Sequence, residues 1–442
     1  MQTIIACTTP LGYSGIAVIR LSGSDAFSIA EALMAEKKQW KHRTALLAEC
    51  LDSTGALIDQ CIFLPFFAPN SFTGEDVVEI SCHGNPLIVD AIIDQSISYG
   101  ARLARNGEFS RRAVLNNKLS LLRAEALNQV IHASSFEGIA LAQNGLTGAV
   151  DLNEQEIREE LLDICAEIEA EMDYPQEDLA DSTDEDLAER LKKIEEKARA
   201  SANSYKENKI RLEGAKVVIL GPVNAGKSSL FNHLVGTKRA IVNSRAGTTR
   251  DIIERRVLFE GIEVCFFDTA GARFDTDDPI EKEGIQMGLE LAKESDLCLF
   301  LCPSNQELGV VSYLQEETAS IPSILVASHI DKEPSPRFEA DVHISNISTK
   351  GIAELKERIR HELGISQSRE SKWIALSQRQ QELFLSIAEH LSIAQEALLG
   401  FLGPVVAAEE ITQALERMAE LRGDSAREAV LDRLFSRFCI GK

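Results

Sequence analysis

One stretch decides the fold of the chain's centre: residues 216–230 have the sequence KVVILGPVNAGKSSL. The consecutive apolar residues 217–220 are typical of a buried strand. The motif G-x-x-x-x-G-K-S follows at residues 221–228, and the pattern after it is helical. A strand, a glycine-rich loop and a helix in this order predict a phosphate-binding loop, or P-loop.

Each part of this loop has a task in phosphate binding. Gly221 and Gly226 allow the backbone to fold tightly, so that its N–H groups and the positive end of the following helix face a phosphate chain. Lys227 adds a mobile positive charge, and the Ser228 hydroxyl is suited to coordinate Mg²⁺. We therefore expect a nucleotide site here rather than an ordinary glycine turn.

Composition limits the class of protein. The chain has 442 residues, enough for several domains that each bury a core. Its formal net charge of −23 argues against broad, nonspecific nucleic-acid binding. A nucleic acid could then bind only on a local patch or through a second protein. Nine scattered cysteines without a C-x-x-C pair indicate reduced thiols. We expect a cytoplasmic protein, with no membrane span and no targeting leader.

Residues 1–118 predict a mixed α+β domain, because short strand patterns alternate there with helical ones. The segment Gly84-Asn85-Pro86 predicts a helix start with proline in the first turn. The expected strands are residues 3–7, 16–21, 44–51, 57–65 and 77–82, and the first expected helix runs from about residue 24 to 35.

The rest of the chain predicts a helical domain that is interrupted by an α/β domain. Residues 119–211 show long helical patterns with few breakers, among them Gly138 and Gly145, and residues 369–442 return to helix. Between them, residues 212–368 alternate strands and helices, which implies a largely parallel, doubly wound sheet. The expected strands are residues 216–220, 254–258, 263–267, 297–301, 323–327 and 342–344. The fold class is therefore multidomain α+β and α/β, with a Ras-like P-loop domain inserted in an all-helical one.

Two motifs downstream of the P-loop indicate a GTPase. Residues 247–251, Gly-Thr-Thr-Arg-Asp, lie in a polar stretch whose threonines can close over a γ-phosphate, and Thr249 is the expected second Mg²⁺ ligand. The motif Asp268-Thr269-Ala270-Gly271 follows an apolar strand; its Asp can hold the metal's outer sphere, and its Gly lets an N–H approach the γ-phosphate. Either motif alone is weak, but together with the P-loop they predict a GTPase switch.

Base recognition departs from the usual N/T-K-x-D pattern. Here the residues after a buried strand are Ser328-His329-Ile330-Asp331. Asp331 keeps the carboxylate that accepts two hydrogen bonds from guanine, but Ser and His replace the bracing Asn and the stacking Lys. Guanine remains the expected base, with reduced affinity and selectivity, and residues 345–347, Ser-Asn-Ile, are expected to back its O6 atom.

The water-orienting glutamine of Ras-like enzymes is also missing, because Ala272 stands at that position. Hydrolysis must then depend on another group, and most of the nearby acidic residues are expected to be ordinary loop charges. The acidic candidates are Asp275, Asp277, Asp278 and Glu281.

At this point the motifs resemble those of one family, the tRNA-modification GTPases called MnmE or TrmE. The shared motifs are Gly-x-x-Asn-x-Gly-Lys-Ser, Gly-Thr-Thr-Arg-Asp and Asp-Thr-Ala-Gly-x-Arg. The resemblance extends over the whole chain through four further stretches: residues 70–76 (NSFTGED), 107–110 (GEFS), 116–119 (NNKL) and 438–442 (FCIGK).

The resemblance implies that the N-terminal domain binds 5-formyltetrahydrofolate or a related one-carbon folate and forms a homodimer. The matching folate-binding positions are Arg20, Glu79, Lys118 and Lys442. Cations suit the glutamate tail of a folate, and a carboxylate suits its pterin edge. Without the resemblance, the same residues would be ordinary strand and surface charges.

The resemblance also implies that K⁺ replaces an arginine finger, with ligands drawn from Asn224, Asn243, Arg245 and Thr248. Here Asn243 and Arg245 depart from the family's usual residues. Glu281 matches the family's water-orienting carboxylate. Cys439 matches a cysteine considered catalytic in the tRNA reaction, and a purely structural thiol at the end of a helix remains an equal alternative.

The complete set of GTP-binding residues that we expect combines the P-loop, the switch motifs and the base loops. It comprises Asn224, Ala225, Gly226, Lys227, Ser228, Ser229, Asn243, Ser244, Arg245, Ala246, Gly247, Thr248, Thr249, Asp268, Thr269, Ala270, Gly271, Ser328, Asp331, Ser345, Asn346 and Ile347.

Three functions are weighed on these grounds. The resemblance implies a K⁺-activated GTPase that acts with an FAD- and NADH-dependent MnmG (GidA)-type partner, in a heterotetramer or larger complex, on C5 of the tRNA wobble uridine at position 34. A ribosome-assembly GTPase shares the P-loop and switch motifs but has no use for Lys118 or the 439–442 tail. A degenerate GTPase is the third reading, prompted by Ser328 and His329.

Overall fold

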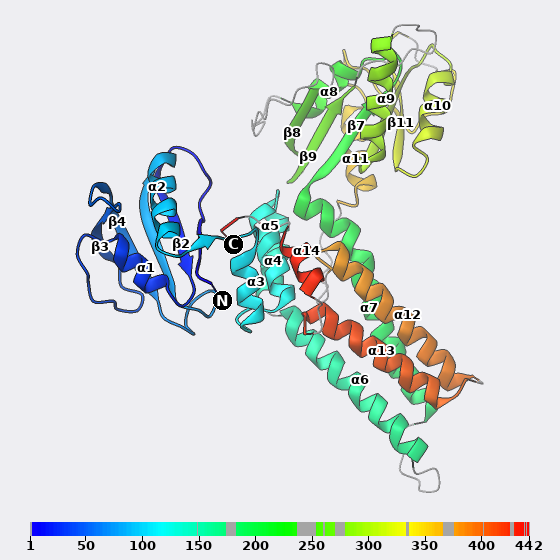
Figure 1. Cartoon of the computed structure of the whole chain (residues 1–442). Coiled ribbons are helices and arrows are strands. Elements are labelled where there is room, and N and C mark those ends of the chain that lie inside the picture. Colours follow the sequence, from blue (N-terminus) through cyan, green and yellow to red (C-terminus); the bar gives the residue numbers. More distant parts are fainter. Residues whose placement is uncertain are drawn as a thin grey trace. The chain divides into compact units, whose positions relative to one another are not determined.

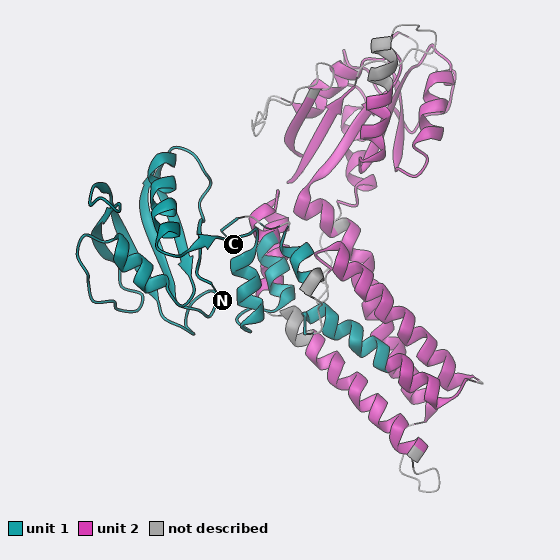
Figure 2. Cartoon of the chain, viewed as in Figure 1, with its two compact units in different colours: residues 1–128, 412–442 teal, residues 129–411 magenta. Residues whose placement is uncertain are grey.

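The computed structural model describes residues 2–147, 149–173, 183–236, 253–259, 261–269, 279–332, 336–365, 375–400, 402–424, 428–436, 438 and 440–441. The chain divides into two compact units, coloured separately in Figure 2. Unit 1 combines residues 1–128 with residues 412–442, and unit 2 comprises residues 129–411.

Unit 1 contains a six-stranded sheet with strand order β3-β4-β5-β2-β1-β6 (Figure 1). Its strands are β1 (Ile4–Cys7), β2 (Ser14–Ser22), β3 (Leu46–Leu51), β4 (Leu57–Phe66), β5 (Val77–Gly84) and β6 (Arg102–Leu103). Paired strands are antiparallel except β1 and β6, which run parallel. The register places Arg20 of β2 opposite Glu79 of β5, so both side chains lie on one face.

The helices of unit 1 are α1 (Ala26–Leu33), α2 (Pro86–Ser98), α3 (Glu108–Leu115), α14 (Glu428–Phe435), the first part of α4 (Leu121–His132) and the last part of α13 (Pro404–Arg422). Side chains alternate along β1, so Ile5 packs in the core with α1 and α2, whereas Ile4 packs on the other face with Phe109 of α3. The Asn85 side chain accepts a hydrogen bond from the Leu87 N–H and caps α2, as the Asn-Pro start predicts.

Segments from opposite ends of the sequence meet inside unit 1. Leu121 and Ala124 of α4 share a core with Leu431 and Phe435 of α14. Farther on, Gly441 lies so close to β1 that a Cβ there would be 2.6 Å from the Cys7 carbonyl oxygen. Residues 428–441 therefore complete a unit that the first residues begin.

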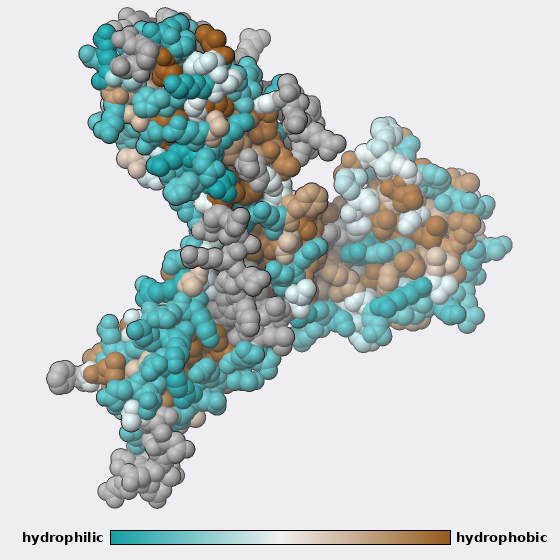
Figure 3. Space-filling view, turned by 180° about the vertical axis from the view of Figure 1, so that it is seen from behind, coloured by the Kyte–Doolittle hydropathy of each residue, from teal (hydrophilic) through white to brown (hydrophobic). Residues whose placement is uncertain are grey.

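Unit 1 also leaves apolar side chains on its surface. Leu11, Tyr13 and Ile16, at and before the start of β2, are 77%, 86% and 65% exposed. Figure 3 shows apolar residues gathered over part of this unit's surface. In the part of the chain that the structure describes, no helix is both long enough and apolar enough to cross a membrane.

The helices of unit 2 outside its sheet are α5 (Phe136–Leu146), α6 (Ala149–Asp173), α7 (Asp184–Glu213), α12 (Gln378–Leu399) and the first part of α13 (Pro404–Arg422). Helix α7 runs alongside α12 (Figure 1), and the Gln395 amide donates to Glu195 across this contact. The helical segments before and after the inserted domain therefore pack together, which confirms the predicted insertion. Gly138 and Gly145, predicted as breakers, instead lie inside α5, where the missing side chain of Gly138 lets the Arg211 carbonyl approach closely.

The inserted domain has a six-stranded sheet with order β12-β11-β10-β7-β9-β8. Its strands are β7 (Ala215–Leu220), β8 (Ile253–Phe259), β9 (Ile262–Asp268), β10 (Leu297–Pro303), β11 (Ser323–Ser328) and β12 (Val342–His343). All pairs are parallel except β8 with β9. The helices are α8 (Lys227–Val235), α9 (Pro279–Lys293), α10 (Gly309–Glu317) and α11 (Ile352–Glu362).

Helices cover both faces of this sheet. Val217 and Ile219 of β7 point into a core that includes residues of α8 and α11, and Val218 points into a second core that includes residues of α9 and α10. This is the doubly wound arrangement that the sequence predicts, and it puts the carboxyl ends of β7, β9, β10 and β11 at one edge. Three elements were not predicted from the sequence: the short strand β6 and the helices α3 and α10.

Candidate functional site

The P-loop connects β7 to α8 at the carboxyl edge of the inserted sheet. Gly221 passes so close to β10 that a Cβ would be 2.3 Å from the Leu301 carbonyl oxygen. Asn224 and Gly226 both adopt positive φ, 62° and 89°, so the chain turns sharply into α8. No acidic residue occupies the first turn of α8, which leaves the N–H groups and helix dipole there without a competing negative charge.

Lys227 is folded back over this loop. Its Nζ donates to the carbonyl oxygens of Gly221 at 3.1 Å and Pro222 at 2.9 Å. Burial lowers the pKa of Lys227 to about 8, although the negative charge of Asp268 opposes that shift. The ammonium group therefore sits in a partly dry site, where phosphate oxygens would compensate its charge better than neutral carbonyls do.

Asp268 ends β9, the strand next to β7, and pairs in register with Ile219. Its Oδ1 is buried and has no hydrogen-bond partner in the described part of the chain. Next to it, the Thr269 hydroxyl donates to the Ile219 carbonyl oxygen at 2.7 Å. A buried carboxylate oxygen without a donor fits the hydration shell of a Mg²⁺ ion bound at the nearby phosphates.

Ser328 and His329, which replace the usual residues of the base motif, still contact the P-loop. The Ser328 hydroxyl donates to the Ala225 carbonyl oxygen at 2.7 Å. His329, with φ of 60°, places its Nε2 3.0 Å from the Asn224 carbonyl oxygen, so this nitrogen carries the donated proton. The serine and histidine thus reach the loop with side chains shorter than the usual asparagine and lysine.

Asp331 is held for recognition of a base edge. The Ser345 hydroxyl donates to Asp331 Oδ1 at 2.7 Å and lowers the pKa of this carboxyl. The neighbouring Asn346 makes a contact that was not predicted from the sequence: its Nδ2 donates to the Gly226 carbonyl oxygen at 3.1 Å. Ile347 is 80% exposed.

Several predicted site residues lie outside the described residues. These are Asn243, Ser244, Arg245, Ala246, Gly247, Thr248, Thr249, Ala270, Gly271, Cys439 and Lys442. Glu281 is part of α9, but its side chain is also outside the description. Asn224 is therefore the one predicted K⁺ ligand, and Ser228 the one predicted Mg²⁺ ligand, within the described part of the chain.

In unit 1, the predicted folate residues Arg20 and Glu79 form an ion pair. The Nε and Nη2 atoms of Arg20 donate to Glu79 Oε1 at 3.0 and 2.8 Å. The guanidinium also lies 5.4 Å from the ring centre of Phe72 and 5.5 Å from that of Phe109. Lys118 is exposed next to Gly74, beside the same motif as Phe72.

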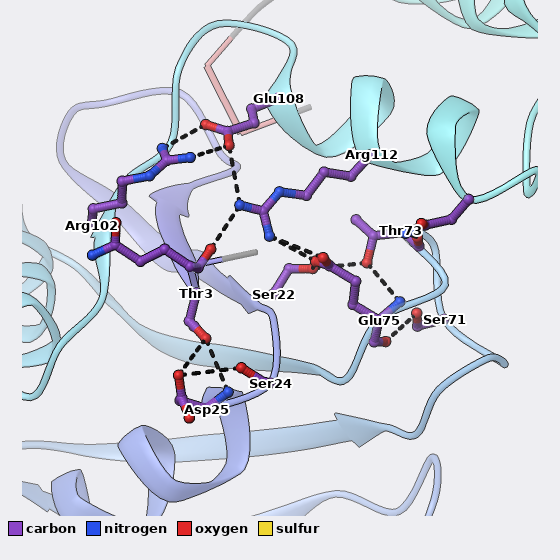
Figure 4. Close-up of polar contacts among 12 residues, drawn as sticks. Thr3, Ser22, Ser24, Asp25, Ser71, Thr73, Glu75, Arg102, Glu108 and Arg112 are labelled. Carbon is purple, nitrogen blue, oxygen red and sulfur yellow. Dashed lines mark hydrogen bonds and ion pairs between the residues drawn. The ribbon is translucent and has the colours of Figure 1, made fainter.

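A second ion-pair network lies in the same unit (Figure 4). The buried Arg112 donates through Nη1 to Glu75 at 2.9 Å and through Nη2 to Glu108 at 3.1 Å. Arg102 binds Glu108 from another side, and the Ser22 hydroxyl donates to Glu75 at 2.7 Å. Burial alone would raise the pKa of Glu108, but hydrogen bonds from Arg102, the Arg105 N–H and Arg112, together with the charge of Arg102, lower it to about 2.

This network was missed in the sequence analysis. Glu75 and Glu108 stand within two quoted motifs, NSFTGED and GEFS, and Arg112 follows four residues after Glu108. The i, i+4 spacing of Glu108 and Arg112 was the one available signal. We call Arg20, Glu75, Glu79, Arg102, Glu108 and Arg112 together the arginine centre.

Comparisons with known proteins identify relatives along the whole chain. A family model described as "GTP-binding protein TrmE N-terminus" matches residues 3–118, and one described as "MnmE helical domain" matches residues 121–439. Proteins named "tRNA modification GTPase MnmE" from Francisella philomiragia subsp. philomiragia and Francisella tularensis subsp. tularensis are each 37% identical over 452 aligned positions. Each alignment covers 100% of this chain and 99% of the relative.

Among solved structures, the G domain of the Thermotoga maritima FeoB iron transporter matches 34% of this chain and 98% of its own length, with 25% identity and a TM-score of 0.28.

Proposed function

The chain belongs to the family of tRNA modification GTPases called MnmE or TrmE, and we propose that it hydrolyses GTP to drive modification of tRNA. In this proposal a K⁺-activated GTPase acts with an FAD- and NADH-dependent MnmG-type partner in the cytoplasm. Together they add a carboxymethylaminomethyl or aminomethyl group to C5 of the wobble uridine, position 34, and a folate supplies the one-carbon unit.

One observation carries the GTPase part of the proposal. The P-loop, the buried Lys227 and a carboxylate oxygen of Asp268 that has no partner among the described residues meet at the ends of two adjacent parallel strands. Ser228 and Thr249 would hold Mg²⁺, which would supply positive charge to neutralise the phosphate oxygens. Lys227 would exchange its two loop carbonyls for phosphate oxygens, and Glu281 would orient the attacking water.

Asn224 supports the K⁺ part of the proposal. Its positive φ and the His329 contact fix the backbone of this loop position, so the side chain that would bind K⁺ starts from a fixed Cα. Asn243, Arg245 and Thr248 would contribute the remaining oxygens. A monovalent cation there would supply positive charge opposite the charge that develops on the phosphates.

The folate part rests on Arg20, Glu79, Lys118 and Lys442. Arg20 and Glu79 already satisfy each other, and two aromatic rings flank the guanidinium. A folate would therefore bind by competing for one member of this pair, with Phe72 and Phe109 as apolar surfaces for its rings. The exposed Leu11, Tyr13 and Ile16 support a homodimer through unit 1, because such side chains are commonly covered in assemblies.

GTP turnover of the full chain in K⁺ and in Na⁺ buffer tests the GTPase. We expect turnover in K⁺, little in Na⁺, and none for Lys227→Ala in either. Equal negligible rates in both buffers for the unaltered chain would instead support a degenerate GTPase.

Complementation tests the tRNA reaction. We expect a strain that lacks this chain to lose wobble uridine modification, the unaltered chain to restore it, and Arg20→Ala to fail. Normal modification in the deletion strain would contradict the proposal and favour a ribosome-assembly GTPase.

A further inference from the structure

Three consecutive carbonyl groups of the P-loop are each held by a side chain from the base-recognition loops. The carbonyl oxygens of residues 224, 225 and 226 receive hydrogen bonds from His329 at 3.0 Å, Ser328 at 2.7 Å and Asn346 at 3.1 Å. The residues of the usual N-K-x-D motif supply such bracing from one loop, whereas here it comes from two loops.

Ser328 cannot do the full work of an asparagine at its position. A hydroxyl has a single proton to donate, and Ser328 donates it to the Ala225 carbonyl oxygen. An asparagine amide has two donor hydrogens and an acceptor oxygen, so it can brace the P-loop and a second loop at once. The second brace comes from another loop, through the Asn346 amide, which donates to the Gly226 carbonyl oxygen.

Asn346 is also joined to the group that reads the base. Its neighbour Ser345 donates to Asp331, and His233 of α8 places Nε2 2.7 Å from the Asn346 carbonyl oxygen. A continuous path of contacts therefore runs from Asp331 through residues 345–346 to Gly226. The Oδ1 of Asn346 is buried without a partner among the described residues, an unfavourable arrangement for a side chain that only fills space.

We propose that Asn346 is a positioning residue for guanine selectivity, and that it replaces the brace that an asparagine at position 328 would provide. The inference rests on the proposed GTP-binding function and deepens it. Asp331 would recognise the 2-amino group of guanine, and the Asn346–Gly226 hydrogen bond would hold Asp331 at the right distance from a base whose phosphates the P-loop binds.

Nucleotide affinities of the full chain test this inference, with GDP compared to IDP, which lacks the 2-amino group. The variants are Asn346→Ala, Ser328→Asn and the double variant. We expect Asn346→Ala to weaken GDP binding about 3- to 10-fold, the range that one hydrogen bond supports, and to weaken IDP binding less. In the Ser328→Asn background, the same substitution should have little effect, because the new amide supplies the second brace.

Ser348→Ala is the matched control, because it removes an exposed hydroxyl from the same loop and should leave both affinities unchanged. Equal losses of GDP and IDP affinity in Asn346→Ala would overturn the inference, since general damage to the domain predicts that pattern. A full effect of Asn346→Ala in the Ser328→Asn background would also overturn it. If the unaltered chain binds no guanine nucleotide, the proposed function itself fails, which separates that failure from failure of the inference.

Discussion

The P-loop site of unit 2 and the arginine centre of unit 1 use their charges in opposite ways. Around the P-loop, the bracing bonds run from side chains to backbone carbonyls, and the Asp268 oxygen keeps no partner in the described structure. In the arginine centre every arginine binds a glutamate. The first site thus keeps charge ready for a ligand, whereas a ligand of the second must displace an internal partner.

The difference has a consequence for stability. Where two charges pair inside a unit, removal of one leaves the other buried and unpaired, which destabilises the unit strongly. Charges kept for a ligand do the reverse. They lower the stability of the protein while the site is empty and raise it once the ligand is bound. We therefore expect substitutions in the arginine centre to affect folding first and substitutions in the P-loop site to affect binding first.

The largest effect is expected for Arg112→Met. The Arg112 side chain is 2% exposed, and its loss leaves Glu75 without its arginine and Glu108 with only Arg102. We expect the free energy of unfolding of unit 1 to fall by about 3–5 kcal/mol. Trp40 lies in unit 1, so urea unfolding followed by fluorescence in a Trp373→Phe background measures this loss.

Arg102→Met serves as the control for that measurement. Its side chain is 35% exposed and Arg112 still binds Glu108 in its absence, so the loss should be smaller, about 1.5–3 kcal/mol. Equal losses for the two variants would contradict the view that burial of Arg112 makes the network structural.

A smaller effect is expected for Gly441→Ala. Gly441 has φ of 93°, and a Cβ would lie 2.6 Å from the Cys7 carbonyl oxygen. Strain of about 1–3 kcal/mol should release residues 438–441 from β1 and speed amide hydrogen exchange in β1 and in α14 about 5- to 100-fold, while GDP affinity stays unchanged.

Gly55→Ala separates backbone strain from the lost contact. Gly55 has a similar φ of 83°, but its Cβ would meet nothing within 4 Å. Hydrogen exchange in β1 should therefore remain slow in this variant, and fast exchange in both variants would show that the close approach at Cys7 is unimportant.

The smallest effect is a pH dependence of GDP affinity. The free chain holds the pKa of Lys227 at about 8, and bound phosphates would raise it, so binding takes up a proton above pH 8. Affinity should then fall as pH rises from 8 to 9, by up to about tenfold, and stay constant from 7 to 7.5. Fluorescence titrations across this range measure it.

Lys227→Arg is the matched variant, because its guanidinium remains charged over the whole range. Its GDP affinity should be lower than that of the unaltered chain but independent of pH. An unaltered chain whose affinity is constant from pH 7 to 9 would contradict the assigned role of Lys227 burial.

Local patterns predicted the P-loop site better than the arginine centre. Strands β7 and β9 contain continuous apolar runs at residues 217–220 and 264–267, and the glycine spacing between β7 and α8 has few structural solutions. The three carbonyl braces, in contrast, come from residues about 100 or more positions away from the P-loop. No periodicity in a sequence reports such contacts.

The arginine centre illustrates a further limit. Arg112 looks like a surface charge on an amphipathic helix, and only the approach of Glu75 from 37 positions away shows why it is buried. The β6 strand is too short to leave a pattern, and its pairing with β1 depends on the loop that follows α2. The sequence therefore predicts the secondary structure of each segment, but much less of its tertiary contacts.

Because unit 1 combines segments from both ends of the chain, it cannot be completed until synthesis is almost finished. Residues 129–411 leave the ribosome between the two parts of this unit, which takes roughly 15 to 60 s at ordinary elongation rates. During that interval Leu121 and Ala124 lack the apolar partners that α14 will bring. A nascent chain that stalls before residue 431 therefore exposes this apolar surface to chaperones and proteases, even when its nucleotide domain has already folded.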